Sequence, residues 1–426
     1  MNILVITLNA WNVTNSTGNT MSNLFSELSD ADEIANIYCR DEAIDNTICE
    51  HYFKITENDI IRNVFTPNQC GKIVQKEESS RNLKLNILTK GSKVGATIYR
   101  HRSTTLMLLR EMIWALPVWK NKKLKNFLSE FSPDCIYMHG HHNLYMHKLL
   151  QFCACETNAK TVLYWGDDMY GRKSMIPLNY LYESMLRRAF RKSISNASLL
   201  FGGSIKLCEE YTGIFKKPFI PFFKECKKVQ YDKEKKTGNP ITIVYAGNLL
   251  YGREKMMVEL VKALYRINSK NLIRQYQLKI FSNTSPTQES LQYLNKEKVC
   301  DFMGRKPYSE VCEAMDNADL ALFIESFRKK DTLSTRLSFS TKIIDCMQST
   351  AGILAIGPKE IASIEYIAKS DIGIVISSLS EIDTILEDVA NHPDIIQEKN
   401  KVKVKFAKEF HTNTSARALD EIRKIF

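Results

Sequence analysis

Short apolar runs alternate with longer amphipathic stretches along most of the chain. Runs of about five or six apolar residues closed by glycine or proline are typical of parallel strands that are buried on both faces. The first series of runs predicts a helix near 20–28 and strands at 2–7, 33–39, 135–140, 161–165 and 198–203. Residues 56–130 show no clear pattern.

A second series begins after a polar, lysine-rich stretch at 224–240, which we predict to be a linker. It predicts strands at 241–247, 276–282, 299–304, 320–325, 352–357 and 372–377. Strands that alternate with helices in this way indicate doubly wound α/β sheets, in which ligands bind at the carboxyl ends of the strands. A chain of 426 residues is long enough for two such domains.

The composition is that of a globular chain, with 44% hydrophobic and 25% charged residues. The net charge of +11 fits an anionic partner, such as a nucleotide, a nucleic acid or an acidic lipid surface, although a solvated lysine-rich surface is the default explanation. The eleven cysteines are scattered without CxxC pairs, which favours free thiols in a reducing cytoplasm. The first residues lack the basic region and cleavage site of a signal peptide.

The residues most suited to bind a ligand lie close together in SFSTKIIDCMQSTAGILAIG, residues 338–357. If Ser340 or Thr341 caps a helix here, Lys342 lies in its first turn and Asp345 on the same face, three residues along. A lysine at the positive end of a helix dipole is unfavourable unless an anion is near. An ammonium group suits a diphosphate and a carboxylate suits the hydroxyls of a ribose. The alternative is a surface ion pair without a ligand.

The segment VCDFMGRKPYSEVCEAMDNADLALFIESF, followed by TKIIDCMQSTAGILAIG, resembles the donor half of family-4-type glycosyltransferases of bacterial surface polysaccharides. The resemblance implies the GT-B fold, with two Rossmann-like doubly wound domains that face each other across a cleft. We therefore expect an N-terminal acceptor-side domain at 1–223, the linker at 224–240, a nucleotide-sugar-binding domain at 241–405, and a C-terminal helix at 406–426 that crosses back to the first domain.

The same resemblance assigns donor-binding roles. Lys342 contacts the phosphates, with Ser340 and Thr341 at the helix entry, and Asp345 contacts the ribose. Gly247 follows the first strand of the domain, and Arg253 and Lys255 clasp the diphosphate, although Asn248 stands where an arginine is usual. The alternative for Arg253 and Lys255 is a solvated first helical turn. Gly304 matches a family position where the chain turns at the nucleotide base.

The chain departs from the family at the first of two glutamates that many members carry eight positions apart. Leu337 occupies that position. Glu325, at the end of LALFIE, either reaches the donor sugar in its place or ends a strand in solvent.

In the N-terminal half, Gly18 lies in a loop that the family makes glycine-rich, where a glycine permits close backbone approach to a ligand. His139 matches a family histidine that contacts the donor sugar, with His141 as second choice. Asp167 and Asp168 in GDDM either meet the acceptor or cap the next helix. The spacing of the histidines does not fit a zinc site, so we expect no metal.

Two segments bear on membranes. Residues 105–125 are apolar and end in basic residues, which indicates either an interfacial segment or a helix that lines the protein's own core or acceptor cleft. The basic helix with Arg187, Arg188, Arg191 and Lys192 either meets an anionic membrane or is a solvated face.

The function predicted by these features is a retaining, metal-independent, hexosyltransferase-like transfer of sugar from a nucleotide diphosphate. The acceptor is a glycan or a lipid-linked molecule in polysaccharide biosynthesis, with Lys342, Arg253 and His139 as catalytic residues. We expect no cofactor beyond the donor and no nucleic-acid partner. The expected location is the cytoplasm or the inner face of the plasma membrane. The alternatives are a GT-B nucleotide-sugar epimerase and a non-catalytic nucleotide-sugar-binding subunit.

Overall fold

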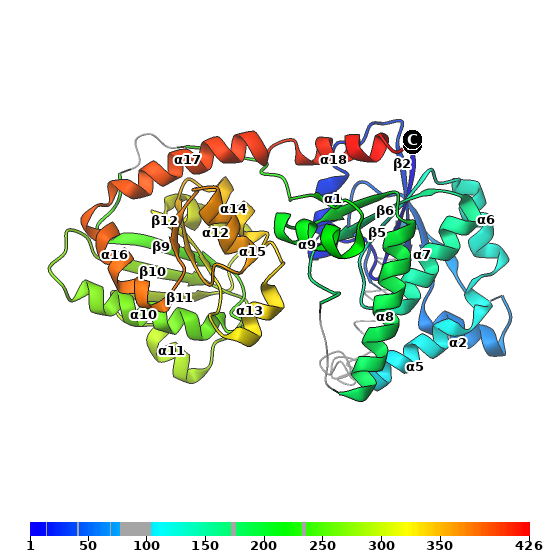
Figure 1. Cartoon of the computed structure of the whole chain (residues 1–426), viewed down its shortest axis with the longest axis horizontal. Helices are drawn as coiled ribbons and strands as arrows, with labels where there is room; N and C mark the ends of the chain where they lie inside the picture. Colours follow the sequence, from blue (N-terminus) through cyan, green and yellow to red (C-terminus); the bar gives the residue numbers. More distant parts are fainter. Residues whose placement is uncertain (14, 41, 69, 77–103, 172–175, 232–235) are drawn as a thin grey trace. The chain divides into compact units, whose positions relative to one another are not determined.

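The computed structural model describes all residues except 14, 41, 69, 77–103, 172–175 and 232–235. The chain divides into two compact units (Figure 1). Unit 1 comprises Met1–Phe222 and Ser415–Phe426, and unit 2 comprises Phe223–Thr414. The chain thus passes from unit 1 to unit 2 and returns at its C-terminal end. Residues 224–240, predicted as a linker, are part of unit 2.

Unit 1 is built on a sheet that has eight strands within the described residues, in the order β4-β3-β2-β1-β5-β6-β7-β8. The pairings are parallel, except that β4 is antiparallel to β3. The strands are β1 (Asn2–Thr7), β2 (Glu33–Tyr38), β3 (His51–Lys54), β4 (Lys72–Val74), β5 (Cys135–His139), β6 (Lys160–Trp165), β7 (Leu199–Gly202) and β8 (Ile220–Pro221).

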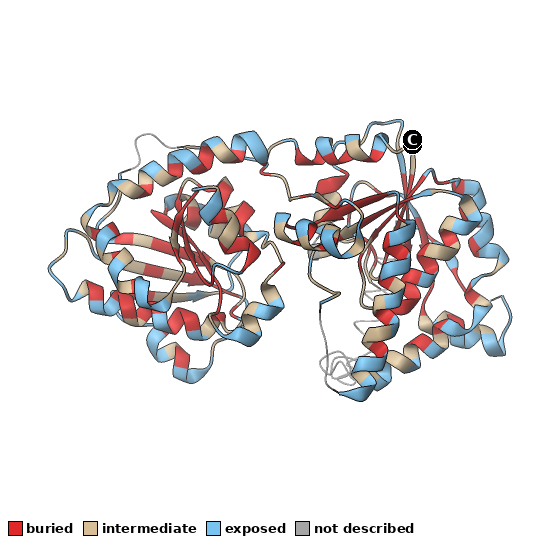
Figure 2. Cartoon of the chain, viewed as in Figure 1, coloured by how far each residue is buried: buried red, intermediate tan, exposed pale blue. Residues whose placement is uncertain are grey.

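Helices cover this sheet and bury their apolar faces against it (Figure 2). Residues from the C-terminal helix, such as Leu419 and Ile422, join the same core as Trp11 and Tyr137. The helices are α1 (Ser16–Leu24), α2 (Glu57–Phe65), α5 (Thr104–Ala115), η1 (Pro117–Trp119), α6 (Lys122–Phe131), α7 (Leu144–Thr157), α8 (Pro177–Asn196), α9 (Ile205–Phe215) and α18 (Thr414–Arg423).

Unit 2 has a parallel sheet with six strands within the described residues, in the order β11-β10-β9-β12-β13-β14. Numbered along the unit this is 3-2-1-4-5-6, the order of dinucleotide-binding folds. The strands are β9 (Ile241–Ala246), β10 (Tyr276–Phe281), β11 (Cys300–Gly304), β12 (Leu320–Ile324), β13 (Gly352–Ile356) and β14 (Ile374–Ile376).

Two apolar cores lie on the two faces of this sheet, which is why its strands are apolar at nearly every position. The helices are α10 (Arg253–Asn268), α11 (Gln288–Leu294), α12 (Tyr308–Asn317), α13 (Lys329–Thr335), α14 (Lys342–Gln348), α15 (Ala362–Lys369), η2 (Leu379–Glu381), α16 (Ile382–Asn391) and α17 (Asp394–Phe410).

The predicted fold class, a doubly wound α/β domain, is therefore confirmed in each unit. Each sheet also has a switch point, where the strand order reverses. In unit 1 this point lies between β1 and β5, and in unit 2 it lies between β9 and β12. Loops that leave neighbouring strands in opposite directions open a crevice there, so these two points are where ligands are expected. No helix in the described part of the chain is long and apolar enough to cross a membrane.

Candidate functional site

The switch point of unit 2 brings a buried ion pair to the ends of β9 and β12. Arg253 is the first residue of α10, and its Nη2 donates a hydrogen bond to Oε1 of Glu325, at 2.6 Å, directly after β12. Nη1 donates to the side-chain oxygen of Asn248 at 2.9 Å. Only 6% of Arg253 and 3% of Glu325 is exposed. The two alternatives, a solvated turn for Arg253 and a solvated strand end for Glu325, are therefore wrong.

Arg253 remains charged in this environment. Burial lowers the pKa of its guanidinium, but the adjacent Glu325 carboxylate raises it, and the net shift is upward. Its Nε is buried and has no hydrogen-bond partner among the described residues. An unsatisfied charged donor at a switch point is available to a ligand oxygen.

Lys342 completes a positively charged cluster with this pair. Its side chain passes over Gly247, where an added Cβ would lie 2.2 Å from the Lys342 Cε, so the glycine makes room for the lysine. Its Nζ lies 5.8 Å from the ring centre of Tyr245. Burial, and then the charge of Arg253, lower the pKa of Lys342 to about 8. Two cations and one carboxylate leave a net positive charge next to the crevice.

The start of α14 differs from the expected capping arrangement. Thr341 precedes the helix, but its side chain accepts no hydrogen bond from the helix amides, so hydroxyl capping by Thr341 is wrong. Backbone carbonyls act instead, since Ser340 O accepts from Ile343 N at 3.0 Å and Thr341 O from Ile344 N at 3.1 Å. The Ser340 amide donates to the hydroxyl of Ser363 at 3.0 Å, which anchors the helix entry to α15.

Asp345 faces a lysine that the sequence analysis did not identify. Its Oδ1 lies 3.7 Å from Nζ of Lys224, which is an ion-pair distance but too long for a hydrogen bond. The alternative to ligand binding, a surface ion pair between Asp345 and Lys342, does not occur among the described residues. Burial raises the pKa of Asp345, and Lys224 partly opposes this shift. Oδ1 has no hydrogen-bond partner among the described residues, which leaves it able to accept from a ligand hydroxyl.

The other residues predicted to bind the nucleotide-sugar donor lie outside the cluster of Arg253, Glu325 and Lys342. Lys255 is exposed on α10, as the solvated-turn alternative expects. Gly304 ends β11 with a φ of 66°, and no atom lies within 4 Å of an added Cβ, so only its backbone conformation requires glycine. Leu337, at the position of the missing glutamate, is only 1% exposed and packs in the interior.

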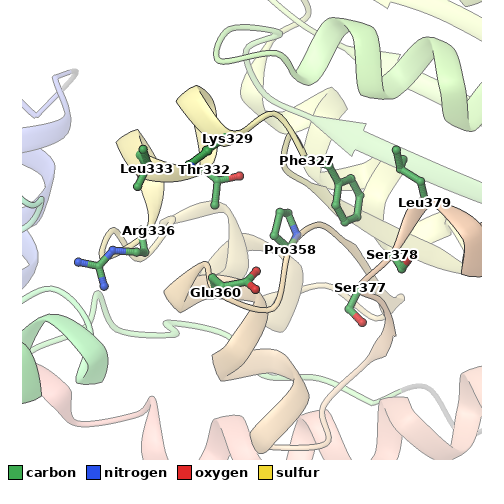
Figure 3. Close-up of a pocket in the computed structure, with 10 residues that line it drawn as sticks. All are labelled: Phe327, Lys329, Thr332, Leu333, Arg336, Pro358, Glu360, Ser377, Ser378 and Leu379. Atoms are coloured by element: carbon green, nitrogen blue, oxygen red, sulfur yellow. The ribbon is translucent and has the colours of Figure 1, made fainter.

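A pocket of about 560 Å³ opens at the carboxyl ends of β12, β13 and β14 (Figure 3). Phe327 and Pro358 form apolar walls, and Lys329 and Glu360 bring charges. Gly357, which precedes Pro358, packs against Glu325 of the ion pair, since a Cβ added to Gly357 would lie 3.0 Å from the Cβ of Glu325. The hydroxyl groups of the pocket come from Thr332, Ser377 and Ser378. Such a volume is typical of small-molecule sites.

The switch point of unit 1 holds two histidines with free ring nitrogens. His139 ends β5 and His141 lies in the loop that follows. In each, Nε2 is buried without a hydrogen-bond partner among the described residues. Burial lowers the pKa of both imidazoles to about 3, so both are neutral near pH 7. A neutral imidazole can donate to or accept from a sugar hydroxyl.

Residues that the sequence analysis did not identify hold the histidine loop in place. Glu111 of α5 accepts from the amide of Leu144, the first residue of α7, at 2.7 Å, and thus caps α7 from another helix. Tyr182 donates to the carbonyl oxygen of His142 at 2.7 Å. The Nε2 of His147 lies 3.0 Å from the carbonyl oxygen of His141. These contacts fix the loop between His139 and Leu144.

The two aspartates of GDDM differ in their surroundings. Asp168 Oδ1 accepts from the amide of Gly171 at 2.9 Å and from the hydroxyl of Tyr211 at 3.0 Å, which is a local structural role. Asp167 is exposed in the loop that follows β6, and its contact with an acceptor stays a prediction. Within the described ranges, no three His, Cys, Asp or Glu side chains are grouped to hold a metal ion.

Gly18 lies in α1 and makes a close approach, but to the protein itself. A Cβ added there would lie 2.0 Å from the carbonyl oxygen of Asn12, and the Gly18 amide donates to the side chain of Asn15 at 2.7 Å. Packing of the loop after β1 therefore requires a glycine at this position. The contact of Gly18 with a ligand stays a prediction.

Comparison with known proteins identifies the fold. No family model and no curated protein matches the sequence. The structure is similar to that of Alr3699/HepE from Anabaena in complex with UDP and glucose, with a TM-score of 0.60, 12% identity and coverage of 100% of this chain and 98% of that one. Sucrose-phosphate synthase from Thermosynechococcus elongatus gives a TM-score of 0.61, 12% identity and coverage of 100% and 99%.

The lipopolysaccharide outer core galactosyltransferase WaaB gives a TM-score of 0.56 and 13% identity, with 99% of each chain covered. These proteins have the GT-B fold of glycosyltransferases. The chain is therefore a GT-B-fold protein over its whole length, as the resemblance implied.

Proposed function

We propose that the protein is a glycosyltransferase that transfers a sugar from a nucleotide-diphosphate donor. The observation that carries this proposal is the cluster of the buried pair Arg253 and Glu325 with the partly buried Lys342 at the switch point of the parallel sheet in unit 2. A buried guanidinium with an unsatisfied donor and a partly buried ammonium, next to the N-terminus of α10, are suited to bind a diphosphate. Similar folds have been solved with UDP and with UDP-glucose, which supports the same donor class here.

We assign the diphosphate to Lys342 and Arg253, with Gly247 leaving room for the Lys342 side chain to lie over the backbone. Asp345 accepts from the hydroxyls of the ribose, because its Oδ1 is otherwise unpaired by hydrogen bonds. Lys342 has a pKa of about 8 and so is mostly protonated at pH 7. A bound diphosphate raises this pKa further, because opposite charge favours the charged form.

The chemical step breaks the bond between the anomeric carbon and the phosphate oxygen and forms a bond to an acceptor oxygen. Negative charge grows on the leaving diphosphate, so the two cations stabilise the transition state more than the bound donor. We assign retention of configuration, on the resemblance of the Lys342 and Asp345 motif. The departing phosphate then takes the proton of the acceptor hydroxyl on the same face of the sugar. Lys342 and Arg253, in place of a metal ion, balance the negative charge of the leaving diphosphate.

The histidine loop of unit 1 is assigned to sugar hydroxyls. His139 and His141 are neutral and offer unpaired ring nitrogens, which suits orientation of a hydroxyl group and not charge stabilisation. The acceptor is a glycan or a lipid-linked sugar of polysaccharide biosynthesis. The eleven cysteines are all free, which supports a reducing cytoplasmic location.

The test is a thermal-shift screen with UDP-, GDP-, ADP- and dTDP-sugars. A donor that binds only the folded protein raises its melting temperature, and we expect Lys342→Ala to abolish the shift. Lys262→Ala is the matched control, because Lys262 is a partly exposed lysine of α10 that pairs with Glu259. It should keep the shift.

Product analysis of the donor that binds then separates the alternatives. Release of nucleotide that depends on an added glycan supports transfer. Conversion to a second nucleotide sugar identifies an epimerase, and binding without turnover identifies a non-catalytic subunit. A shift that persists in Lys342→Ala would place the donor elsewhere.

A further inference from the structure

Two backbone carbonyl groups of the loop between β5 and α7 are held by side chains of neighbouring helices. The Nε2 of His147, in α7, lies 3.0 Å from the carbonyl oxygen of His141. The hydroxyl of Tyr182, in α8, donates to the carbonyl oxygen of His142 at 2.7 Å. The position of this histidine loop, and with it the ring of His141, therefore depends on α7 and α8.

The end of the loop depends on Glu111, which lies in α5. Asn143 occupies the N-cap position of α7, but its side chain makes no capping hydrogen bond. The Oε1 of Glu111 accepts from the amide of Leu144, the first residue of the helix, at 2.7 Å. A carboxyl group from another helix thus takes the place of the local cap, and the fold uses it to hold the loop where α7 begins.

Glu111 also contacts Tyr182, and the two distances around this hydroxyl indicate where its hydrogen lies. The carbonyl oxygen of His142 is 2.7 Å away, and the Oε1 of Glu111 is 3.3 Å away. A tyrosine hydroxyl has one hydrogen to donate, and the shorter contact takes it. The lone pairs of the tyrosine oxygen then face the carboxyl group. A neutral carboxyl group can donate its own hydrogen to them, whereas an ionised one has none to donate.

The burial of Glu111 favours the same neutral form. Only 6% of the residue is exposed, and its Oε2 is buried without a hydrogen-bond partner among the described residues. An ionised carboxylate that is removed from water without full pairing is costly. Burial raises the pKa of Glu111 to about 7, so both the neutral and the ionised form are present near neutral pH.

The groups that face Glu111 from the neighbouring helices do not reverse this balance. From α7, Lys148 and the amide hydrogen bond stabilise the ionised form, but the effect of burial on the pKa is larger. From α8, Tyr182 is the group in contact. From α2, Glu57 is paired with Arg110 of α5 at 3.1 Å. The net upward shift therefore leaves the protonation of Glu111 sensitive to small changes around pH 7.

We propose that Glu111 is a positioning residue for the histidine loop, and that it holds the loop in place only in its neutral form. Neutral Glu111 leaves the Tyr182 hydrogen on the carbonyl oxygen of His142. When Glu111 releases its proton to water, the carboxylate becomes the stronger acceptor and takes that hydrogen. The carbonyl group of His142 then loses its anchor. The effect on catalysis rests on the proposed function, in which His139 and His141 orient a sugar hydroxyl.

The first experiment tests the loop and needs no substrate. Hydrogen exchange of the full chain, followed by mass spectrometry, compares the wild type with Glu111→Gln in the peptide that covers residues 140–147. Glutamine keeps an oxygen acceptor for Leu144 and cannot ionise. We expect equal exchange at pH 6. At pH 8.5 the wild type should exchange about fivefold faster, the factor that corresponds to one hydrogen bond of about 1 kcal/mol.

The second experiment measures kcat as nucleotide release from the sugar of the UDP, GDP, ADP and dTDP panel that raises the melting temperature. The kcat of Glu111→Gln, divided by that of the wild type, should rise about fivefold from pH 6 to pH 8.5. Both proteins contain Lys342, so its deprotonation cancels in this ratio. Tyr182→Phe should lower kcat about fivefold at pH 6, because it removes the same anchor.

The matched control is Glu130→Gln, because Glu130 is an exposed glutamate of α6 in the same unit. Its exchange and its kcat should stay within about twofold of the wild type at both pH values, as is usual for surface substitutions. The melting temperature of each variant shows whether it is folded.

Three results would overturn the proposal. The first is equal exchange of the wild type and Glu111→Gln at pH 8.5, since the loop would then not respond to ionisation. The second is faster exchange with a constant kcat ratio, since the loop would then move without effect on transfer. The third is wild-type exchange in Tyr182→Phe at pH 6. If no sugar nucleotide of the panel binds, the proposed function fails, while the exchange measurement still decides whether Glu111 holds the loop.

Discussion

At the residue scale, the functional cluster of unit 2 depends on one ion pair whose members are 72 positions apart in the chain. Arg253 and Glu325 are each nearly excluded from water, and the pair is tolerated because each charge meets its partner at 2.6 Å. The same geometry makes the pair fragile, because removing one partner leaves an uncompensated buried charge. The cluster therefore contributes to the stability of unit 2 as well as to its proposed chemistry.

We predict that Glu325→Ala lowers the free energy of unfolding of unit 2 by about 3–5 kcal/mol, because it leaves Arg253 buried without its partner. Calorimetry at neutral pH measures the effect. Glu310→Ala is the control, since Glu310 forms an exposed pair with Lys306 at 3.6 Å and its loss should cost less than about 1 kcal/mol. Equal effects of the two substitutions would show that Arg253 finds water or another partner.

At the element scale, α14 is held at its C-terminal end by a lysine from α17. Lys403 is fully buried, and its Nζ donates to the carbonyl oxygens of Ser349 at 2.6 Å and Ala351 at 2.5 Å. A cation is favourable at the negative end of a helix, and these carbonyls have no partner within the helix. Lys403 thereby fixes the helix that carries Lys342 and Asp345.

We predict that Lys403→Met destabilises unit 2 by about 3 kcal/mol, because it leaves buried carbonyl oxygens unpaired. It should also weaken donor binding, since α14 loses its anchor. The comparison is Lys401→Met, an exposed position on the same helix, which should change stability by less than about 0.5 kcal/mol. A stable Lys403→Met protein with weak donor binding would mean that α14 moves without unfolding.

The strands that the apolar runs predict are confirmed, but three strands of unit 1 were missed. β3 has the sequence HYFK, with polar residues at both ends, and β8 has only two residues. β4, KIV, falls in the stretch from 56 to 130 where the pattern is unclear. Short edge segments carry too few apolar residues for a periodic signal, so their pairing depends on the neighbouring strand.

At the scale of the whole molecule, stability depends on pH through the histidines of unit 1. Burial lowers the pKa of His139 and His141 to about 3 and that of His147 to about 4, from 6.5. Below pH 6.5 the unfolded chain binds more protons than the folded one, so this contribution is lost as the pH falls. Glu111, whose pKa burial raises from 4.5 to about 7, acts in the opposite direction between those values.

With about 1.4 kcal/mol per group and pH unit, three histidines opposed by one glutamate lose stability at a rate that approaches about 3 kcal/mol per pH unit near pH 5. At pH 6.5 the rate is smaller, because each unfolded histidine is only half protonated there. We therefore predict that unit 1 is destabilised steeply between pH 6.5 and pH 5. Trp11, Trp114, Trp119 and Trp165 are the four tryptophans of the chain and all lie in unit 1, so their fluorescence in urea reports its unfolding alone. Glu111→Gln should steepen the loss, and a flat profile would contradict the burial of the histidines.

The sequence by itself determined the two α/β series and the lysine motif, because strand and helix patterns are local and each apolar run must be buried. It also located Lys342, Asp345 and Arg253 close to where the fold places crevices. The tertiary structure decided which side chains these residues contact. Glu325 meets Arg253, Lys224 meets Asp345, and Glu111 caps α7 because strand order and helix packing bring distant positions together. No local pattern encodes such pairs, since their spacing along the chain is set by the topology.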